Sequence, residues 1–568
     1  MRASLTGPRA VAAGITAVVL APLALPGYVL RYDMVFVPEQ PLNWEMIAPA
    51  DALPRAVPLD AVVSLADLVV PGWLLQRIAL VAIVYLAALG AARLVPGGRR
   101  LTGVVAAFAY AWTPFLAERL LLGQWALLLA YGALPWLVIA ARDLRAGRRG
   151  ALPRLVLAAA PAALTPTGGL IALVAVAVLL IPMRSRTLAA ALGAVTALNL
   201  PWIVAALAST AGGSSDPEGV AQFAARAENW AGTLVSLLGT GGIWNAQTVP
   251  GSRTSALAPV VTLLLLAAAA IGFRELWRRW RGDAVRLFVL AGGGFLLAVA
   301  GATPAAGLLR WLVVSVPGAG LLRDGQKFLI PYALVLALGF ALGAERLADR
   351  LARRFEPNAG RILLISALLL PVVAMPDLAF GAAGALRPVS YPADWDAVAA
   401  RVDAAPGEVL SLPFEGYQRY DWADGVVVRD PAPRYLNAPV LINDALRVGR
   451  VTVDGESPRA ARAQALLDAG RPVAELGSRW VLVRTGLAGT LPPATLDGLR
   501  LAYDGRYLQL WENPSPGVLS ETSVARRIPA LAAHLLAGTV VIFACFCLLR
   551  VRRGSWYGPR NHESGEEE

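Results

Sequence analysis

The sequence predicts an α-helical integral membrane protein, with about twelve transmembrane helices and one small α/β domain near its C-terminal end. Three observations lead to this fold class. Of the 568 residues, 57% are hydrophobic and only 16% are charged, and the mean hydropathy is +0.57. Apolar runs long enough to cross a bilayer recur along the chain. Short clusters of arginine separate these runs, as in the loops of multi-spanning proteins.

The expected spans are apolar runs of about 17 to 25 residues, together with slightly shorter runs that need short or tilted helices. They lie near residues 10–30, 72–94, 101–117, 124–141, 187–208, 256–273, 284–301, 327–343, 361–380 and 528–549. Residues 153–182 are also apolar but are broken by TPTGG (165–169). That motif predicts two short helices that meet in a Pro/Gly turn.

Arginine placement predicts which side each loop faces, because basic residues stay preferentially on the cytoplasmic side of short loops. On a twelve-span path, the clusters from Arg2 and Arg9 to Arg550–Arg553 all fall on one side. Both termini are therefore expected in the cytoplasm. The sequence predicts a protein that crosses the plasma membrane several times. A cleaved signal peptide is the alternative reading of residues 1–30, but no A-x-A site closes that run.

This path divides the chain into four parts and leaves several segments outside the membrane. The parts are a membrane domain (1–387), an extracytoplasmic α/β domain (388–515), a final transmembrane helix (516–550) and a cytoplasmic polar tail (551–568). The outward segments are residues 31–71, 209–255, 302–326 and 381–527.

Composition excludes several classes of function. The net charge is +12, but the arginines lie between apolar runs rather than on one soluble face, so no nucleic acid is expected as a partner. Two cysteines and two histidines supply almost no material for a structural zinc site or a nucleophilic triad. The only lysine, Lys327, precedes Phe328, so the GxxxxGK[ST] phosphate loop is missing. We expect no cofactor; a divalent cation is compatible with the sequence, but nothing indicates one.

Residues 388–515 differ in kind, since 13 arginines against 16 acids give them a net charge of −3. EVLSLPF (408–414) and RWVLVR (479–484) predict buried strands, and residues 394–405 and 458–470 predict amphipathic helices. LAYDGRYLQLWEN places a DG pair between alternating apolar runs, which predicts a hairpin. Clustered aromatic residues could stack on sugar rings, although half of them are expected in the core. These aromatic residues include Tyr417, Tyr420, Trp422 and Tyr435.

The first outward loop begins RYDMVFVPEQPLNWEMIAPAD and is rich in acids. Asp33 follows the apolar run closely, so we expect it at the membrane surface, where a held carboxylate can act as a general base. The later acids, including Glu39, are expected to be solvated, but Glu39 is kept as a substrate-binding candidate. The stretch DAVVSLADLVVPGWLL predicts a helix along the surface before the second span.

Four stretches resemble one known family. They are GQWALLLAYGALPW (123–136), TPTGG (165–169), FAARAENWAGTLVSLLGTGGIWN (223–245) and LLRDGQKF (321–328). With the multi-spanning topology and the acid after the first span, they resemble the GT-C superfamily of glycosyltransferases, and more narrowly the actinobacterial envelope arabinofuranosyltransferases. The resemblance implies a GT-C-like fold, a polyprenyl-phosphate-linked sugar donor and a base in the first outward loop, where Asp33 is the matching residue. The chain departs from the family pattern by lacking an adjacent acidic pair there.

Lys327 lies with Arg323 and Asp324 at the outward end of an expected span, where basic residues are disfavoured. A lipid-linked sugar leaves a polyprenyl phosphate after transfer, and Arg323 and Lys327 could bind that phosphate with complementary geometry. If both fall on one helical turn, their i, i+4 spacing aims them the same way. The alternatives are an interfacial anchor or a pairing of Lys327 with Asp324.

Other polar residues near outward span ends are further substrate-binding candidates. Gln124 follows Glu118 and Arg119 in an expected tight turn. Glu118 and Arg119 could line a cavity or pair with each other. Glu228 and Trp230 are expected on an amphipathic helix near the surface, where sugar contact competes with packing.

The sequence therefore favours an inverting glycosyltransferase that transfers a sugar, arabinofuranose by resemblance, from a polyprenyl-phosphate donor to an envelope glycan acceptor outside the membrane. Asp33 would deprotonate the acceptor, and Arg323 and Lys327 would receive the phosphate. Two alternatives remain open: a non-catalytic GT-C-like protein that binds glycan or lipid or serves in assembly, and a flippase or transporter of lipid-linked sugar. Transporters usually show internal repeats and mid-membrane charges, which this sequence lacks.

Overall fold

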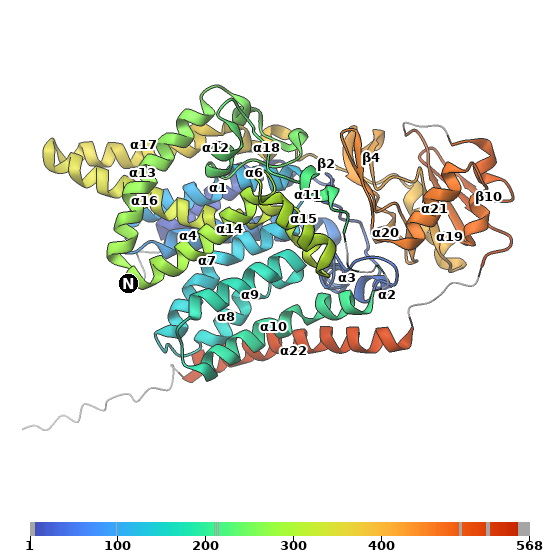
Figure 1. Ribbon diagram of the computed structural model, residues 1–568, viewed down its shortest axis with the longest axis horizontal. Helices are drawn as coiled ribbons and strands as arrows, with labels where there is room; N and C mark the ends of the chain where they lie inside the picture. Colours follow the sequence, from blue (N-terminus) through green and yellow to red (C-terminus); the bar gives the residue numbers. More distant parts are fainter. Residues whose placement is uncertain are drawn as a thin grey trace, which may run out of the picture.

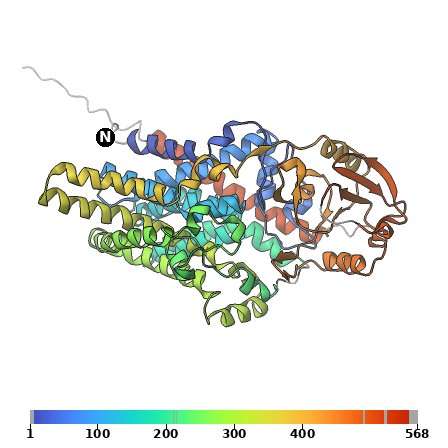
Figure 2. The same ribbon diagram turned by 90° about the horizontal axis from the view of Figure 1, so that it is seen from above.

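The computed structural model describes residues 6–97, 99–209, 211, 213, 215–487, 491–517 and 523–554. It has two parts that lie end to end along the long axis: a bundle of helices, and a smaller α/β part formed between Pro388 and Glu512 (Figures 1 and 2). The last helix, α22 (Val524–Gly554), starts near the α/β part and runs along the bundle against α10 (Ser185–Ala208).

Within the described ranges, nine helices are long and apolar enough to cross a membrane, and each coincides with a predicted span. They are α4 (Gly72–Leu94), α5 (Arg100–Ala111) together with α6 (Pro114–Leu121), α7 (Trp125–Arg145), α10, α13 (Ala258–Arg279), α14 (Arg281–Ala300), α16 (Ile330–Arg354), α17 (Pro357–Ala374) and α22. The other three predicted spans are shorter helices, so the number twelve stays a prediction.

The first predicted span, residues 10–30, is wrong in extent. Helix α1 (Thr6–Val19) ends eleven residues before the apolar run does. Pro22 and Pro26 lack a backbone N–H for the helix ladder, and Gly27 has a φ of 108°. The rest of the run therefore forms a short 3₁₀ turn (Ala21–Ala24) and strand β1 (Tyr28–Val29).

Residues 153–182 form two short helices, as predicted. Helices α8 (Ala151–Ala159) and α9 (Pro166–Leu180) are joined by a 3₁₀ turn (Ala162–Leu164). The Thr165 hydroxyl accepts a hydrogen bond from the Gly168 backbone N–H at 3.2 Å and so caps α9. TPTGG is therefore the start of a helix, and the break lies just before it.

Helix α16 lies in the centre of the bundle and crosses α13 with the backbones in close contact. A Cβ added at Gly272 would lie 1.7 Å from the carbonyl oxygen of Gly339, and one added at Gly343 would lie 1.8 Å from that of Ala268. Gly339 and Gly343 form a GxxxG pair, the pattern that lets two membrane helices approach closely.

The α/β part contains a five-stranded sheet of order β10-β11-β9-β3-β6. Strands β3 (Val409–Leu412) and β9 (Trp480–Arg484) are parallel and fully buried, as their continuous apolar sequences predict. Strands β10 (Arg500–Asp504) and β11 (Leu508–Glu512) form the predicted hairpin. The edge strand β6 is Val440–Leu441, and the two predicted helices are α19 (Asp394–Ala404) and α21 (Pro458–Asp468).

Smaller elements join the two parts. Strand β1 pairs with β2 (Pro388–Val389), which ties the chain after α1 to the start of the α/β part. Two hairpins extend from the α/β part: β4 (Tyr417–Tyr420) with β5 (Val426–Arg429), and β7 (Leu446–Val448) with β8 (Val451–Val453). The remaining helices are α2 (Trp44–Ile47), the predicted surface helix α3 (Leu59–Asp67), α11 (Glu218–Gln222), α12 (Gly232–Leu238), α15 (Ala306–Ser315), α18 (Ala379–Gly384) and α20 (Ala432–Tyr435).

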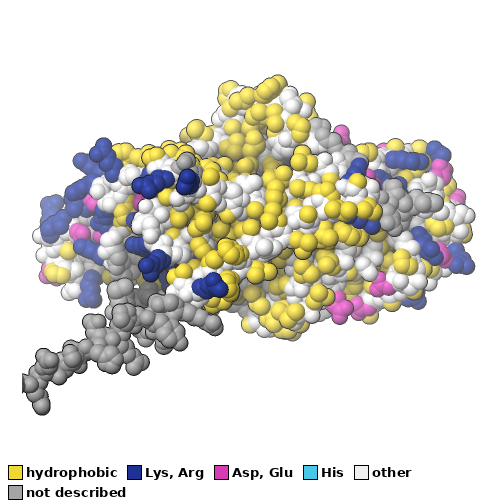
Figure 3. All heavy atoms as spheres, turned by 90° about the horizontal axis from the view of Figure 1, so that it is seen from below, with side chains coloured by type: hydrophobic (Ala, Val, Ile, Leu, Met, Phe, Trp, Pro, Cys, Tyr) yellow, Lys and Arg dark blue, Asp and Glu magenta, His cyan; other side chains and the backbone are white. Residues whose placement is uncertain are grey.

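Side-chain types divide along the long axis of the molecule. On the face in Figure 3, hydrophobic side chains cover the middle, and Lys and Arg gather at the bundle end away from the α/β part. Charges of both signs appear at the α/β end. This arrangement fits an apolar band between two aqueous surfaces.

The α13–α16 contact generates a prediction. Gly343→Ala should lower the melting temperature of the detergent-solubilised protein, because the new methyl group forces the helices apart at a cost of about 1–3 kcal/mol. Gly293→Ala in α14 is the matched control, since nothing lies within 4 Å of its Cβ position and alanine is the better helix former. Equal melting temperatures for the two variants would contradict this account of the crossing.

Candidate active site

A cavity of about 840 Å³ lies between the bundle and the α/β part. Four of the predicted site residues line it: Asp33, Gln124, Arg323 and Lys327. The bundle contributes the α6–α7 turn, the start of α9 and the C-terminal end of α10, and the α/β part contributes both hairpins. Residues far apart in the sequence therefore meet at one site.

Asp33 lies in a tight turn that packs on the α6–α7 turn. Arg31 and Met34 exchange backbone hydrogen bonds at 3.1 and 2.8 Å, and the Asp33 N–H donates to the Leu122 carbonyl at 3.3 Å. Gly123 makes the approach possible, since its φ is +74° and a Cβ there would lie 2.0 Å from the Arg31 carbonyl oxygen. The position of Asp33 thus depends on a backbone-to-backbone contact.

Two side chains hold the Asp33 carboxylate. Tyr417 of β4 donates its hydroxyl to Oδ1 at 2.5 Å, and Gln124 donates its amide to Oδ2 at 3.3 Å. Burial, and next the Asp33 carboxylate, raise the pKa of Tyr417, so its hydroxyl stays protonated and remains a donor. The sequence placed Tyr417 only in a general aromatic cluster; no local pattern relates two residues 384 positions apart.

Arg323 and Lys327 line the same cavity but do not share a helical turn, so the expected i, i+4 geometry is wrong. Asp324 has φ −95° and ψ 74° and separates two 3₁₀ turns, Ala319–Leu322 and Gly325–Leu329. Arg323 points to Glu456 at 3.2 Å and lies over the Phe223 ring, whereas the Lys327 ammonium lies 3.4 Å from Asp324.

Asp324 is the centre of a buried ion-pair network. The fully buried Arg119 binds both of its oxygens, at 3.0 and 3.1 Å. Burial alone would raise the pKa of Asp324, but Arg119 and then Lys327 outweigh it and hold that pKa below its usual value. The suggested pairing of Arg119 with its neighbour Glu118 is therefore replaced by this one.

Glu456 is a site residue that the sequence did not indicate. Its side chain is 3% exposed, although it belongs to the loop after the β7–β8 hairpin. It accepts hydrogen bonds from Arg55 of the first loop, from Arg323 at 3.2 Å and from the Ser215 hydroxyl at 2.9 Å. One carboxylate thus ties three segments together at the cavity wall.

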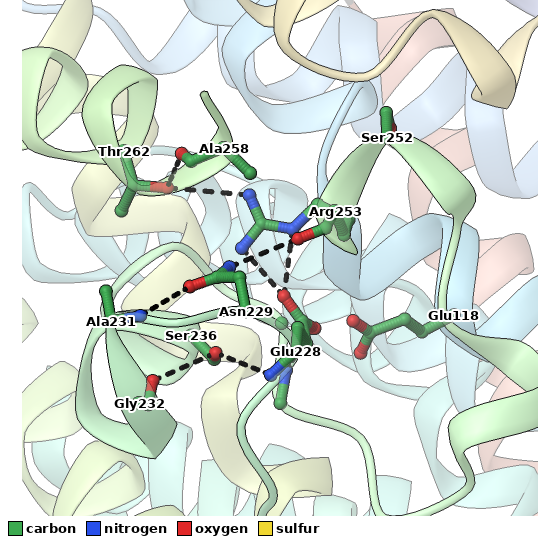
Figure 4. Close-up of polar contacts among 12 residues, drawn as sticks. Glu118, Glu228, Asn229, Ala231, Gly232, Ser236, Ser252, Arg253, Ala258 and Thr262 are labelled. Atoms are coloured by element: carbon green, nitrogen blue, oxygen red, sulfur yellow. Dashed lines mark hydrogen bonds and ion pairs between the residues drawn. The ribbon is translucent and has the colours of Figure 1, made fainter. Parts of the chain in front are cut away.

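The structure does not bring Glu228 to the cavity. Residues 223–231 are a loop between α11 and α12, not the predicted amphipathic helix, because the Asn229 side chain turns the backbone by accepting the Ala231 N–H. Glu228 is buried and pairs with Arg253 at 2.8 Å, and Glu118 faces it from α6 (Figure 4). The Glu228 carboxylate is therefore enclosed within the bundle and does not line the cavity.

Trp230 and Glu39 also lie outside the cavity. The Trp230 ring is 71% exposed, and its indole N–H donates to the Ala256 carbonyl at 3.1 Å. Glu39 is exposed in the first loop. Neither residue is among those that line the cavity, so their expected substrate contact is not supported by the geometry.

The charge of the cavity wall favours an anionic ligand. Seven basic side chains line it against three acidic ones, Asp33, Asp324 and Glu456. The basic residues are Arg55, Arg226, Arg323, Lys327, Arg429, Arg434 and Arg447. Burial, and next the nearby Arg55, lower the pKa of Arg323, so an anion bound beside it would be stabilised. Across the described ranges, no group of three or more His, Cys, Asp or Glu is placed to hold a metal ion.

Part of the cavity lining is apolar. Trp125 and Leu127 of α7 and Trp202, Ile203 and Leu207 of α10 contribute to it. Leu207 is 83% exposed, and α10 is one of the helices apolar enough to cross a membrane. The cavity lining therefore combines basic side chains with apolar side chains, some of them from a candidate membrane span.

Comparison with known proteins identifies the fold. No protein-family model matches the chain, and no curated protein matches it. Among solved structures it is similar to the arabinofuranosyltransferase AftD from mycobacteria, with a TM-score of 0.54 and 18% identity over 92% of this chain and 40% of the AftD chain. Two structures of an AftD mutant give TM-scores of 0.54 at 17% identity, covering 92% and 42%, and 0.51 at 18% identity, covering 90% and 42%.

This likeness shows that the chain shares the fold of the AftD structures over the matched part, which supports the predicted membrane fold. The match covers nearly the whole of this chain, so it includes both the bundle and the α/β part. The chain spans about two fifths of the length of the AftD chains that it matches. At this level of identity the comparison establishes the architecture, and the chemistry has to be argued from the cavity.

The contact at Gly123 generates the second prediction. Gly123→Ala should reduce activity strongly, by about 100-fold for an ångström-scale displacement of the Asp33 turn. Gly147→Ala is the matched control, because its φ of +65° carries the same backbone cost but no atom lies within 4 Å of its Cβ position. Assays of the proposed sugar transfer on both variants measure the difference, and equal activity would show that the Asp33 turn tolerates displacement.

Proposed function

We propose that the protein is an inverting GT-C glycosyltransferase that transfers a sugar from a polyprenyl-phosphate donor to an envelope glycan. The observation that carries the proposal is the single cavity in which Asp33 meets Arg323 and Lys327. An acid that can accept a proton and two cations that can bind a phosphate are the groups that this transfer needs. The likeness to AftD supports arabinofuranose as the sugar.

The lining of the cavity suits the proposed donor. Its basic side chains would bind the phosphate, and its apolar side chains on α7 and α10 would bind the first part of the lipid chain. Because α10 is a candidate membrane span, the donor could enter sideways from the bilayer. The acceptor would then enter from the α/β side, where Tyr417 and the β7–β8 hairpin form the wall.

The proposed reaction proceeds in one displacement. The acceptor hydroxyl gives its proton to the Asp33 carboxylate while its oxygen forms a bond to the anomeric carbon. The bond between that carbon and the phosphate oxygen breaks, and its electron pair leaves with the polyprenyl phosphate. Lys327 and Arg323 would stabilise the added negative charge on that phosphate. Attack opposite the leaving group inverts the anomeric centre.

The proposed topology places this cavity on the outer face of the plasma membrane. Both termini and the arginine-rich end of the bundle would lie in the cytoplasm, in accordance with the positive-inside rule. The α/β part, at the opposite end of the bundle in Figure 1, would lie outside with the glycan acceptor. The division of the chain at residues 387, 515 and 550 belongs to the same proposal.

One observation favours a second candidate, a non-catalytic protein that binds lipid-linked glycan. Arg323 is already paired with Glu456, so a phosphate would have to compete for it. The two candidates differ in whether the wild-type protein transfers sugar at all, and the enzyme proposal further requires that this transfer depend on Asp33.

Asp33→Asn tests the enzyme proposal directly. We expect transfer from a radiolabelled polyprenyl-phosphoryl arabinofuranose to a short arabinofuranoside acceptor to fall by at least about 100-fold, because the amide cannot accept the proton. Binding of the donor should change little. Asp403→Asn on the exposed face of α19 is the control and should retain full activity. Undiminished transfer by Asp33→Asn would show that another group is the base, whereas no transfer by the wild-type protein would favour the second candidate.

Lys327→Met tests the phosphate site. Removing one cation should weaken binding of polyprenyl phosphate about fivefold, which corresponds to about 1 kcal/mol per basic residue at a membrane surface. Asp324 keeps its partner Arg119, so the fold should be retained. Arg419→Met, which removes an exposed cation outside the cavity, is the control. Equal affinities measured by direct lipid-binding titration would exclude Lys327 from the phosphate site.

A further inference from the structure

The α/β part contacts the proposed base directly. Tyr417 lies on β4, in register with Arg429 of β5, and its hydroxyl donates to Asp33 Oδ1 at 2.5 Å. The Tyr417 ring also lies 6.3 Å from the ring of Tyr32, the residue before Asp33. A residue from the α/β part therefore belongs to the immediate surroundings of the carboxylate.

The backbone of the same hairpin binds the turn that carries Asp33. The Tyr32 N–H donates to the Val427 carbonyl at 2.7 Å, and the Arg429 N–H donates to the Tyr32 carbonyl at 2.9 Å. Tyr32 has a φ of +44°, a conformation that a non-glycine residue keeps only when its surroundings impose it. The β4–β5 hairpin thus holds the Asp33 turn from one side, while Gly123 and Gln124 hold it from the bundle side.

The two carboxylate oxygens of Asp33 have different partners. Oδ1 accepts the short hydrogen bond from Tyr417, whereas among the described residues Oδ2 accepts only the long one from the Gln124 amide at 3.3 Å. A base must keep one oxygen available for the incoming proton. Oδ2 is the oxygen with the weaker contact, and it is the one held from the α6–α7 turn that lines the cavity.

We propose that Tyr417 is a positioning residue for the transfer reaction: its hydrogen bond orients the Asp33 carboxylate and leaves Oδ2 as the atom that accepts the acceptor's proton. The proposal rests on the proposed function, because it assigns a role beside the proposed base. It also gives the α/β part a task within the reaction, since Tyr417 and the β4–β5 hairpin supply one of the two sets of contacts that hold the base.

Two cations interact electrostatically with the Asp33 carboxylate: Lys327 from the bundle and Arg429 from β5. A test that depends on pH has to keep both of them. Tyr417→Phe removes one donor and leaves both cations in place. A hydrogen bond donated to a carboxylate favours its charged form, so its loss makes the base easier to protonate. The acidic limb of the pH–rate profile should therefore move to higher pH.

The experiment compares Tyr417→Phe with wild type in the full-length protein, using polyprenyl-phosphoryl arabinofuranose and a short arabinofuranoside. We expect kcat to fall about tenfold or more, as for a lost hydrogen bond to a charged group. The KM for the donor should change little, and the acidic limb should rise by roughly half a pH unit or more. Tyr435→Phe is the matched control, because it removes a tyrosine hydrogen bond of 2.5 Å to Asp396 away from the cavity.

A second variant keeps the test open if Tyr417→Phe folds poorly. A fluorotyrosine at position 417 keeps the ring and the hydroxyl but makes a stronger donor, so the acidic limb should move to lower pH. A purely structural role for Tyr417 would leave the limb unmoved in both variants, and that result would overturn the proposal. Asp33→Asn, assayed alongside, separates the failures: full activity in Asp33→Asn refutes the base itself, whereas an inactive Asp33→Asn with an unchanged Tyr417→Phe refutes only the positioning role.

Discussion

The close approach of the Arg31–Met34 turn to Gly123 is the contact on which the site depends. The two backbones lie so near each other that no side-chain atom fits between them. This contact sets Asp33 at the boundary between the bundle and the α/β part, where Gln124 reaches one carboxylate oxygen and Tyr417 the other. Because the turn is held from both sides, a shift of either part would displace the carboxylate.

A buried ion pair, Arg119 with Asp324, lies beside Lys327 at the cavity. A charge removed from water must be paired, and Arg119, which is fully buried, meets that need with both oxygens of Asp324. That pairing fixes the break in the chain just before α16, so Lys327 projects from the first turn after it into the cavity. The ion pair is therefore best understood as a device that positions Lys327 rather than as a large gain in stability.

The sequence predicted what local patterns determine. Nine apolar runs became helices long enough to cross a membrane, within the part of the chain that the structure describes. In the α/β part, the sequence predicted strands β3 and β9, the β10–β11 hairpin and helices α19 and α21, but not the short strands β2, β4 to β8 or helix α20. Proline chemistry ended α1 early, which hydropathy alone does not register. Asp33 and Lys327 were identifiable because they lie beside apolar runs. Tyr417 and Glu456 were not, since their partners lie hundreds of residues away in the sequence.

The sequence wrongly predicted Glu228 as a site residue and missed Glu456 for the same reason. An acidic residue in a loop looks the same in sequence whether it faces solvent, a ligand or a buried arginine; only tertiary contacts decide. Arg253 lies 25 positions after Glu228 and encloses it within the bundle, whereas Arg55 and Arg323 hold Glu456 at the cavity wall. Glu456 thus pairs with Arg323, the cation proposed to bind the phosphate, and it does so from the α/β part. The α/β part therefore contacts both the proposed base, Asp33, through Tyr417 and a proposed phosphate ligand, Arg323, through Glu456, so a shift of this one part would move partners of both residues.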